Sequence, residues 1–261
     1  MKQIRFLFTL IIILFLNISF LNTVTAEEAP KRVVLKNGIV LLLQERRSIP
    51  TVVFNIKIKA GSIYEPDELA GLANLTAGLL TEGTKTRSSK QISEEIDFVG
   101  GSIGASANSD YAAASLSILK KDINLGLDLL SDILMNPAFD EKEIERERSQ
   151  TLAGIINQKD DPGAIASKAF SKILYLKHPY SRPSEGFEDT LPKIKKEDII
   201  NFHRKYYRPN NTIMAVVGDI TLDEAVSLIE KYFGKWEKAK VSLPKIPSPP
   251  KLTNKNIEII D

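Results

Sequence analysis

The stretch "AGSIYEPDELAGLANLTAGLLTEGTKTRSSKQISEEIDFVGGSIGA", residues 60–105, contains the change of pattern that decides the fold. Just before it, "TVVFNIKIKAGS" (51–62) alternates apolar and polar residues, which is typical of a strand with one face in water. Within it, apolar residues recur at helical spacing, and a helix is expected from about Glu68 to Leu80. The chain therefore passes from a half-exposed strand to a helix near residue 68.

The same stretch predicts a second, shorter helix and then a hairpin. Ser88 or Ser89 is positioned to cap that helix, and Gly100-Gly101 is expected to end it. The segment "SIGASANSDYAAASLSILK" (102–120) then reads as two strands around the turn "NSD". Upstream, "RVVLKNGIVLLLQER" (32–46) contains Asn37-Gly38 between two β-runs, which is a strong hairpin signal.

The rest of the chain is expected to be mainly helical. The predicted segments are helices over 122–135, 141–159, the residues up to 175, 195–206 and 222–233, a loop at 177–186, and a buried strand at 212–219. Hairpins first and helices later indicate an α+β fold, with helices packed on one face of a mainly antiparallel sheet. Residues 27–240 are interpreted as one such domain. The charged run "DEKEIERERS" (140–149) is most simply a solvated helix face, with an interface as the alternative.

Both ends of the chain differ from this domain. Residues 1–26 combine a basic start, an apolar core and a small-residue end, which predicts a secretory signal peptide and a periplasmic or extracellular protein. An uncleaved N-terminal membrane anchor is the alternative. The Pro-rich residues 241–255 are interpreted as a linker, and residues 256–261 as the opening strand of a truncated second domain.

Composition excludes several classes of function. The chain has 261 residues, 43% hydrophobic and 26% charged, which is ordinary for a globular protein. Removing 1–26 takes away two of the 35 Lys and Arg and leaves 33, equal to the 33 Asp and Glu. A neutral mature chain argues against nucleic acid or an anionic membrane as partner. Because the sequence contains no cysteine, it has neither disulfides nor thiolate metal ligands.

Several segments in the same order resemble the pitrilysin/insulinase (M16) family of zinc peptidases, in its N-terminal domain. They are "LKNGIVLLLQE", the stretch 60–105, "FDEKEIERERSQTLAGIINQKDDP", "HPYSRPSEGFEDTLPKI" and "FHRKYYRPNNTIMAVVGDI". Active members carry H-x-x-E-H on the helix after the "AG-S-x-x-E" stretch. Histidines at i and i+4 share a helix face and bind zinc, and the glutamate activates the zinc-bound water.

The resemblance places substitutions at all four functional positions. Asn74 and Gly78 stand at the two histidines, Ala77 at the glutamate, and Gly154 at the further glutamate ligand. Alanine and glycine have no donor atom, and an asparagine amide is a poor zinc ligand. The resemblance therefore implies a non-catalytic member without its own zinc, which is expected only in an active partner.

The two histidines of the sequence, His178 and His203, offer no evident replacement site. The simpler interpretation is a loop imidazole that caps backbone groups for His178 and a half-exposed helix residue for His203. An atypical zinc site would need Asn74, Glu82 and His178 to converge. This arrangement remains the alternative in which the chain is itself a zinc-dependent endopeptidase.

The family's architecture suggests why such a fold is retained. Two homologous halves enclose a chamber, and an extended peptide lies against a sheet edge, where binding uses backbone groups. The equivalent edge here is expected in "SIGASAN" (102–108); tight packing under a helix would equally explain its small residues. The predicted function is to pair with a homologous subunit that has H-x-x-E-H and to help bind peptide. The other alternative is a scaffold subunit of an envelope complex. The candidate peptide-binding residues are Ser102, Ile103, Gly104, Ala105 and Ser106.

Overall fold

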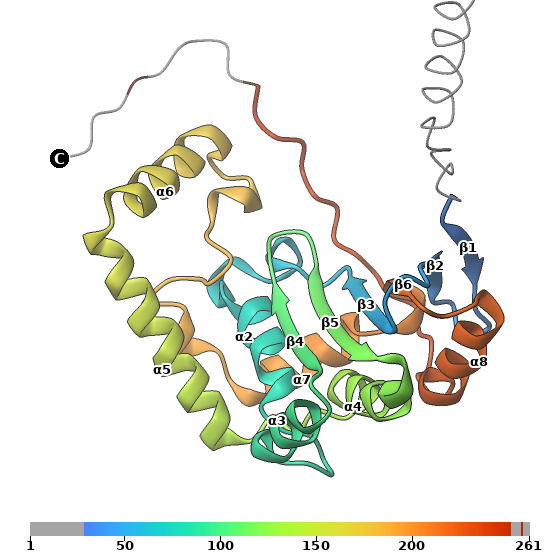
Figure 1. Cartoon of the computed structure of the whole chain (residues 1–261). Helices are drawn as coiled ribbons and strands as arrows, with labels where there is room; N and C mark the ends of the chain where they lie inside the picture. The colour runs from blue at the N-terminus through green and yellow to red at the C-terminus, as the bar shows by residue number, and fades with distance from the viewer. Residues whose placement is uncertain (1–28, 252–256, 258–261) are drawn as a thin grey trace, which may run out of the picture.

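The computed structural model describes residues 29–251 and residue 257, and its centre is a six-stranded sheet (Figure 1). The strand order is β1-β2-β6-β3-β5-β4. All neighbouring pairs are antiparallel except β2 and β6, which run parallel. The strands are β1 (Lys31–Val34), β2 (Val40–Glu45), β3 (Thr51–Ile58), β4 (Ser102–Ala107), β5 (Ala112–Leu119) and β6 (Thr212–Gly218). The expected α+β fold with a mainly antiparallel sheet is confirmed.

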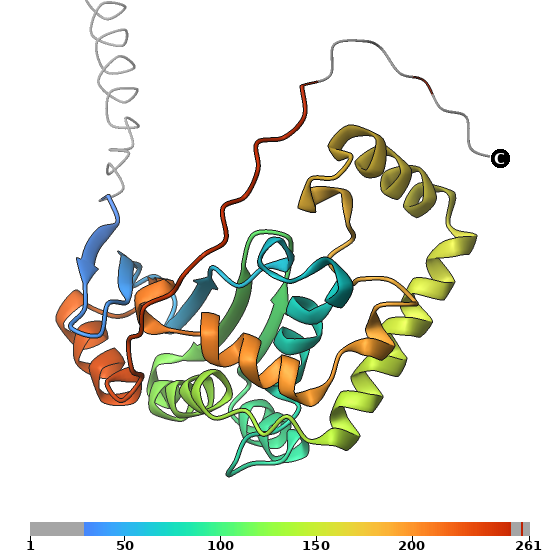
Figure 2. The ribbon, with the colours of Figure 1, turned by 180° about the vertical axis from the view of Figure 1, so that it is seen from behind.

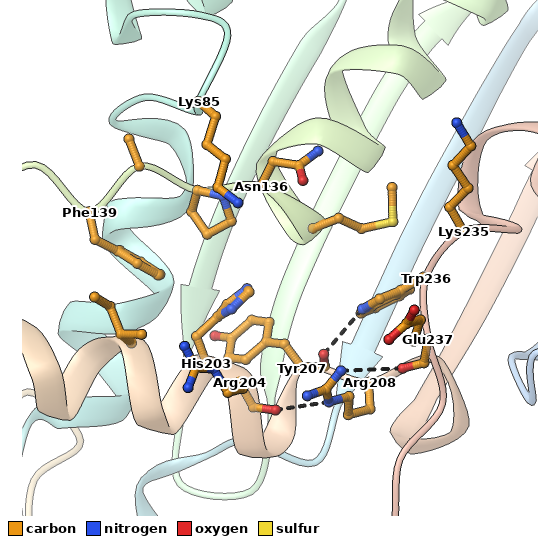
Figure 3. Close-up of a pocket in the computed structure, with 14 residues that line it drawn as sticks. Lys85, Asn136, Phe139, His203, Arg204, Tyr207, Arg208, Lys235, Trp236 and Glu237 are labelled. Carbon is orange, nitrogen blue, oxygen red and sulfur yellow. Dashed lines mark hydrogen bonds between the residues drawn. The ribbon is translucent and has the colours of Figure 1, made fainter.

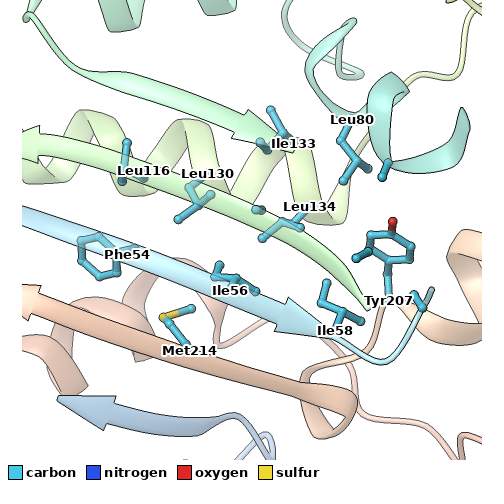
Figure 4. Close-up of a cluster of buried hydrophobic side chains, with 14 of the residues drawn as sticks. Phe54, Ile56, Ile58, Leu80, Leu116, Leu130, Ile133, Leu134, Tyr207 and Met214 are labelled. Atoms are coloured by element: carbon cyan, nitrogen blue, oxygen red, sulfur yellow. The ribbon is translucent and has the colours of Figure 1, made fainter. Parts of the chain in front are cut away.

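The sheet buries one face and leaves the other in contact with solvent. In β3 the side chains of Phe54 and Ile56 are fully buried, whereas those of Asn55 and Lys57 are exposed. The predicted alternation is therefore correct. The buried face packs against helices to form the core that Figure 4 shows, in which Leu130 of α4 (Ile123–Met135) lies over the sheet.

Helices cover that buried face from several parts of the sequence (Figure 2). The remaining helices of the described residues, not all of which lie on that face, are α2 (Leu72–Gly78), α3 (Ser89–Phe98), α5 (Glu141–Asn157), α6 (Pro162–Tyr175), α7 (Lys196–Tyr206) and α8 (Leu222–Phe233). Both predicted hairpins form: residues 35–39 join β1 to β2 with Gly38 at φ 96°, and residues 108–111 join β4 to β5.

Local capping explains the predicted start of α3. The Ser88 hydroxyl accepts a hydrogen bond from the Gln91 backbone N–H, and the Gln91 side chain accepts one from the Ser88 N–H. This reciprocal pair satisfies two N–H groups that have no partner within the helix. Gly100, at φ 64°, follows the helix end, as expected.

The single helix expected over 68–80 is wrong in its continuity. The chain forms a short 3₁₀ turn at Asp67–Leu69, then α2, then a second 3₁₀ turn at Leu79–Thr81. Gly71 interrupts the first two because its φ of 101° lies in the left-handed region. A Cβ at this position would lie 2.7 Å from the Glu185 carbonyl oxygen. A segment far away in the sequence therefore helps to fix where α2 begins.

The helices α5 and α6 form an arm at one side of the molecule. In Figures 1 and 2, α5 runs beside α2 and carries α6 away from the sheet. Asp161, between them, caps α6 through hydrogen bonds from the N–H groups of Gly163 and Ala164 at 2.8 and 3.3 Å. No side chain of α6 is buried.

The predicted terminal features lie largely outside the described residues. These are the signal peptide at 1–26 and, apart from Ile257, the strand expected at 256–261. Residues 236–251, which include most of the Pro-rich segment, form neither helix nor strand. Within the described ranges no helix has the length and apolar character needed to cross a membrane.

Candidate functional site

Helix α2 is held at its N-terminus by a buried carboxylate from the preceding turn. The N–H groups of Gly71 and Ala73 donate to the two carboxylate oxygens of Glu65 at 2.9 and 2.7 Å. Glu65 is only 6% exposed, and burial raises its pKa to about 7 despite those two hydrogen bonds. The helix that carries the substituted motif is therefore positioned by a polar contact inside the core.

The substituted motif positions retain the geometry of a helix face but provide almost no donor atoms. Asn74 and Gly78 lie one turn apart on α2 and are both half-buried, while Ala77 is fully buried. Gly154 is exposed on α5, and apart from its chain neighbours and the nearby backbone of its own helix no atom lies within 4 Å of where its Cβ would be. Only the Asn74 amide among the four has a side-chain donor or acceptor.

A carboxylate from α5 occupies the space beside Gly78. A Cβ at position 78 would lie 2.7 Å from Oε1 of Glu147, so glycine leaves room for this side chain. The pKa of Glu147 is raised by burial and then by the negative charge of Glu82, and Arg146 partly offsets this. Glu147 therefore stands in a partly desolvated, negatively charged environment.

The charges around Glu147 form a small network between α5 and the end of α2. Arg146 donates to Glu82 and, at 2.7 Å, to Glu143, and Ser89 donates to Glu82 at 3.1 Å. Half of the run 140–149 thus contacts the domain, whereas the simplest expectation for it is a solvated face. Sequence reasoning missed this cluster; the i, i+3 and i+4 spacing of positions 143, 146 and 147 is the signal that could have found it.

The donor set in this region does not fit zinc. No group of three or more His, Asp or Glu side chains in the described part of the chain could hold a metal ion. His178 uses both ring nitrogens, since Nδ1 accepts from the Tyr180 N–H at 3.1 Å and Nε2 lies 3.0 Å from the Pro247 carbonyl oxygen. Glu82 is held by Arg146 and Ser89. The atypical ligand set of Asn74, Glu82 and His178 therefore gains no support.

Both histidines match the simpler interpretation given to them. His178 is a buried loop residue that caps the 3₁₀ turn Pro179–Ser181. His203 is half-buried on α7, and its Nε2 lies 2.9 Å from the carbonyl oxygen of Leu134. Burial lowers the pKa of His203 to about 4, so its imidazole is neutral at physiological pH.

The predicted peptide-binding residues lie on the edge strand of the sheet. Strand β4 is last in the strand order, and α2 packs beside it. Among the described residues, no backbone hydrogen bond joins 102–107 to any strand other than β5. Ser102 and Ser106 are exposed, and the three residues between them are half-buried. The backbone groups on the outer side of β4 are therefore available to another strand.

A small cavity opens beside the start of this edge. It has a volume of about 240 Å³ and is lined by residues of α3, the 3₁₀ turn after α2, and β4, including Glu82, Ile92, Ser102 and Ile103. An extended segment paired with β4 could place one side chain in it. The edge strand, this cavity and the Glu82 network thus lie together.

Comparison with known proteins gives a consistent result. The model of the insulinase family (peptidase family M16) matches residues 40–186, and that of the peptidase M16 inactive domain matches residues 193–261. The chain is 28% identical over 207 residues to "uncharacterized zinc protease YmxG" of Bacillus subtilis strain 168, covering 79% of this chain and 50% of that protein. It is 30% identical over 208 residues to an "uncharacterized zinc protease" of Rickettsia felis, covering 80% and 50%.

Solved structures show the same similarity. A peptidase M16 inactive domain from Pseudomonas fluorescens superposes with a TM-score of 0.80 at 29% identity, covering 85% of this chain and 54% of that one. A protease from Helicobacter pylori gives a TM-score of 0.76 at 24% identity, with 85% and 53% covered. The chain spans about half the length of the relatives it matches.

Proposed function

The chain belongs to the insulinase family of peptidases, family M16, and we propose that it is a non-catalytic member that pairs with a zinc-bearing homologue and helps bind peptide. In this proposal the partner subunit carries H-x-x-E-H and performs the hydrolysis. The present chain completes the enclosure and holds the peptide in extended form. It acts after export, in the periplasm or outside the cell.

The observation that carries the non-catalytic part is the chemistry of the motif positions. Ala77 and Gly78 lack any donor, and Gly154 lies in open space on α5. Zinc hydrolysis needs three protein ligands and a general base that faces the metal-bound water. Glu147, which stands where a side chain at position 78 would lie, is a single carboxylate and cannot replace that set.

The outer edge of β4, which pairs with no strand among residues 29–251, supports the peptide-binding part. An incoming strand gains main-chain hydrogen bonds along 102–107 and needs no ionisable group of this chain. The small side chains of Gly104 and Ala105 permit close approach of another backbone. The adjacent cavity of about 240 Å³ would accept one side chain of the bound segment.

Exposed apolar side chains on the α5–α6 arm support pairing with another subunit or domain. Phe170 and Leu176 are 64% and 59% exposed, and Ile156 is 51% exposed. Large apolar side chains exposed on this arm, whose helix α6 has no buried residue, are costly in water and typical of surfaces covered on association. Polar substitution of Phe170 should weaken the complex without unfolding the domain.

The peptide-binding proposal is tested with backbone-methylated peptides. Fluorescence anisotropy measures binding of a labelled unstructured peptide and of two versions N-methylated at alternate residues, in the two possible phases. In a β-pairing mode, only alternate N–H groups point toward β4. One phase should therefore abolish binding, while the other leaves it nearly unchanged. Equal binding of both methylated peptides would refute β-pairing.

The non-catalytic proposal is tested by zinc content and by reconstitution. Elemental mass spectrometry on the purified, tag-free chain should find far less than one zinc per chain after dialysis. Addition of this chain to its H-x-x-E-H homologue should then increase peptide hydrolysis. Stoichiometric zinc would instead favour the atypical zinc peptidase. A stable complex that neither binds peptide nor changes hydrolysis would favour a scaffold.

A further inference from the structure

A second, larger cavity lies apart from the edge strand, where the C-terminal ends of α4 and α7 meet the segment after α8 (Figure 3). Its volume is about 560 Å³, within the usual range for sites that bind small molecules. None of the residues assigned to the peptide-binding edge lines it. The family resemblance assigns no role to it.

Aromatic rings form the inner wall of this cavity. His203 stacks on Tyr207 with ring centroids 4.6 Å apart, and Phe139 meets His203 edge-on at 5.4 Å. The indole N–H of Trp236 donates to the Tyr207 carbonyl oxygen at 3.1 Å. Phe139, Tyr207 and Trp236 are buried, so packing fixes the shape of the wall.

The rim of the cavity is positively charged. Lys85, Arg204, Arg208 and Lys235 line it together with a single acidic residue, Glu237. Within residues 29–251, no carboxylate forms a salt bridge with any of these four cations. Arg208 donates to the carbonyl oxygens of Arg204 and Glu237, at 2.8 and 3.4 Å, and keeps its charge. This arrangement differs from that of Arg87, which three carboxylates surround.

The cations of the rim also lower the pKa of His203, one of the rings of the inner wall. His203 is neutral chiefly because it is buried, and the positive charges of Arg208 and Lys85 further disfavour its protonation. Its Nε2 carries the proton, because the Leu134 carbonyl at 2.9 Å can only accept. The cavity thus combines an uncharged aromatic wall with a rim that has more positive than negative side chains.

We propose that this cavity binds a small organic anion, with its phosphate or carboxylate group at the cationic rim and its flat or apolar body against the aromatic wall. The rim supplies positive charge that attracts the anionic group. The wall supplies apolar contact that a bare inorganic ion cannot use. Binding therefore requires both parts of the ligand.

Isothermal titration calorimetry with three probes tests this on the purified chain. Phenyl phosphate carries both the anionic group and the ring, inorganic phosphate only the anion, and benzyl alcohol only the ring. Phenyl phosphate should bind more tightly than either of the other two, and higher salt should weaken it because exposed charges are screened. Equal affinity for phenyl phosphate and benzyl alcohol, or no binding of phenyl phosphate, would overturn the proposal.

Variants locate the site. Lys85→Ala and Arg204→Ala remove exposed cations that have no carboxylate partner in the described ranges, so the fold should remain intact. Each should weaken phenyl phosphate binding about fivefold, the effect of one unit charge near a surface-bound anion. Lys238→Ala and Lys240→Ala are matched controls, because both residues are exposed and neither lines the cavity. Equal losses in controls and rim variants would show nonspecific attraction and overturn the assignment.

Trp236 and His203 provide a second readout. Trp236 is the only tryptophan of the sequence, and His203 is one of only two histidines, so fluorescence and imidazole NMR signals are readily assigned. Phenyl phosphate should change the Trp236 emission and shift the His203 resonance while leaving the His178 resonance in place. A ligand that shifts only His178 would place binding elsewhere.

Discussion

The buried carboxylate of Glu65 gives the sharpest test of how α2 is held. Each of its two oxygens accepts one hydrogen bond, from the N–H group of Gly71 and from that of Ala73. In Glu65→Gln the amide nitrogen cannot accept, and one buried N–H loses its partner. Such a loss costs about 1–3 kcal/mol in the free energy of unfolding. Near pH 5 the variant should fold but be less stable than the wild type.

The pH dependence of that cost follows from the raised pKa. In the folded state Glu65 has a pKa of about 7, against 4.5 for the free group. Between these values the folded state binds more protons than the unfolded state, so this group lowers stability as pH rises through the window. From pH 5 to pH 8 the wild type should lose roughly 2.5 kcal/mol relative to the glutamine variant, which cannot ionise.

Urea unfolding followed by the fluorescence of Trp236 measures both quantities. The difference between wild type and Glu65→Gln removes the titration of every other group. This difference should be largest near pH 5 and decline by pH 8. Glu68→Gln is the control, because Glu68 is exposed in the 3₁₀ turn that follows Glu65 and its substitution should change stability little at either pH. A wild-type-minus-variant difference that is constant with pH would refute the reasoning.

Three further predictions concern neighbouring features. The imidazole of His203 should titrate near pH 4. The free energy of unfolding should therefore fall as pH drops below 6.5, because only the unfolded state then gains a proton. An NMR titration midpoint above 6 would contradict this. Gly78→Ala should stabilise the Glu147→Ala variant by up to about 1 kcal/mol, because alanine favours helix more than glycine does. In the wild type the gain should be smaller, because the new methyl group meets the Glu147 carboxylate. Equal effects in a double-mutant cycle would exclude that contact. Ser88→Ala should cost about 1 kcal/mol through loss of the α3 cap, whereas the exposed mid-helix Ser93→Ala should be neutral or slightly stabilising; thermal unfolding compares the two.

Local features of the fold were predictable because their causes lie within a few residues. The Ser88–Gln91 capping box and Gly100 bound α3, and Asn37-Gly38 forms the first turn, as their sequences indicate. The alternation of β3 follows from its buried and exposed faces. In each case side-chain and backbone groups close in sequence satisfy one another, so tertiary structure had little left to decide.

Predictions failed where distant segments meet. The helix expected over 68–80 is broken at Gly71. There Glu65 accepts hydrogen bonds from the N–H groups of Gly71 and Ala73, and residues 185–186 pack closely against the turn. The parallel pairing of β2 with β6 joins strands about 170 residues apart in sequence, which no local pattern encodes. The charged residues at 143, 146 and 147 lie against the domain because α5 packs beside α2, a contact between segments that no local pattern encodes.

By itself the sequence determined the family and the chemistry missing from it. The segment order and the residues at positions 74, 77, 78 and 154 are read directly, and a glycine or alanine has no donor in any fold. The tertiary structure decided that β4 is an edge strand, that Glu147 occupies the space beside Gly78, and that Lys85, Arg204 and Lys235 line one aromatic cavity. The physical reason is that side-chain identity is local, whereas strand order and convergence depend on how the whole core packs.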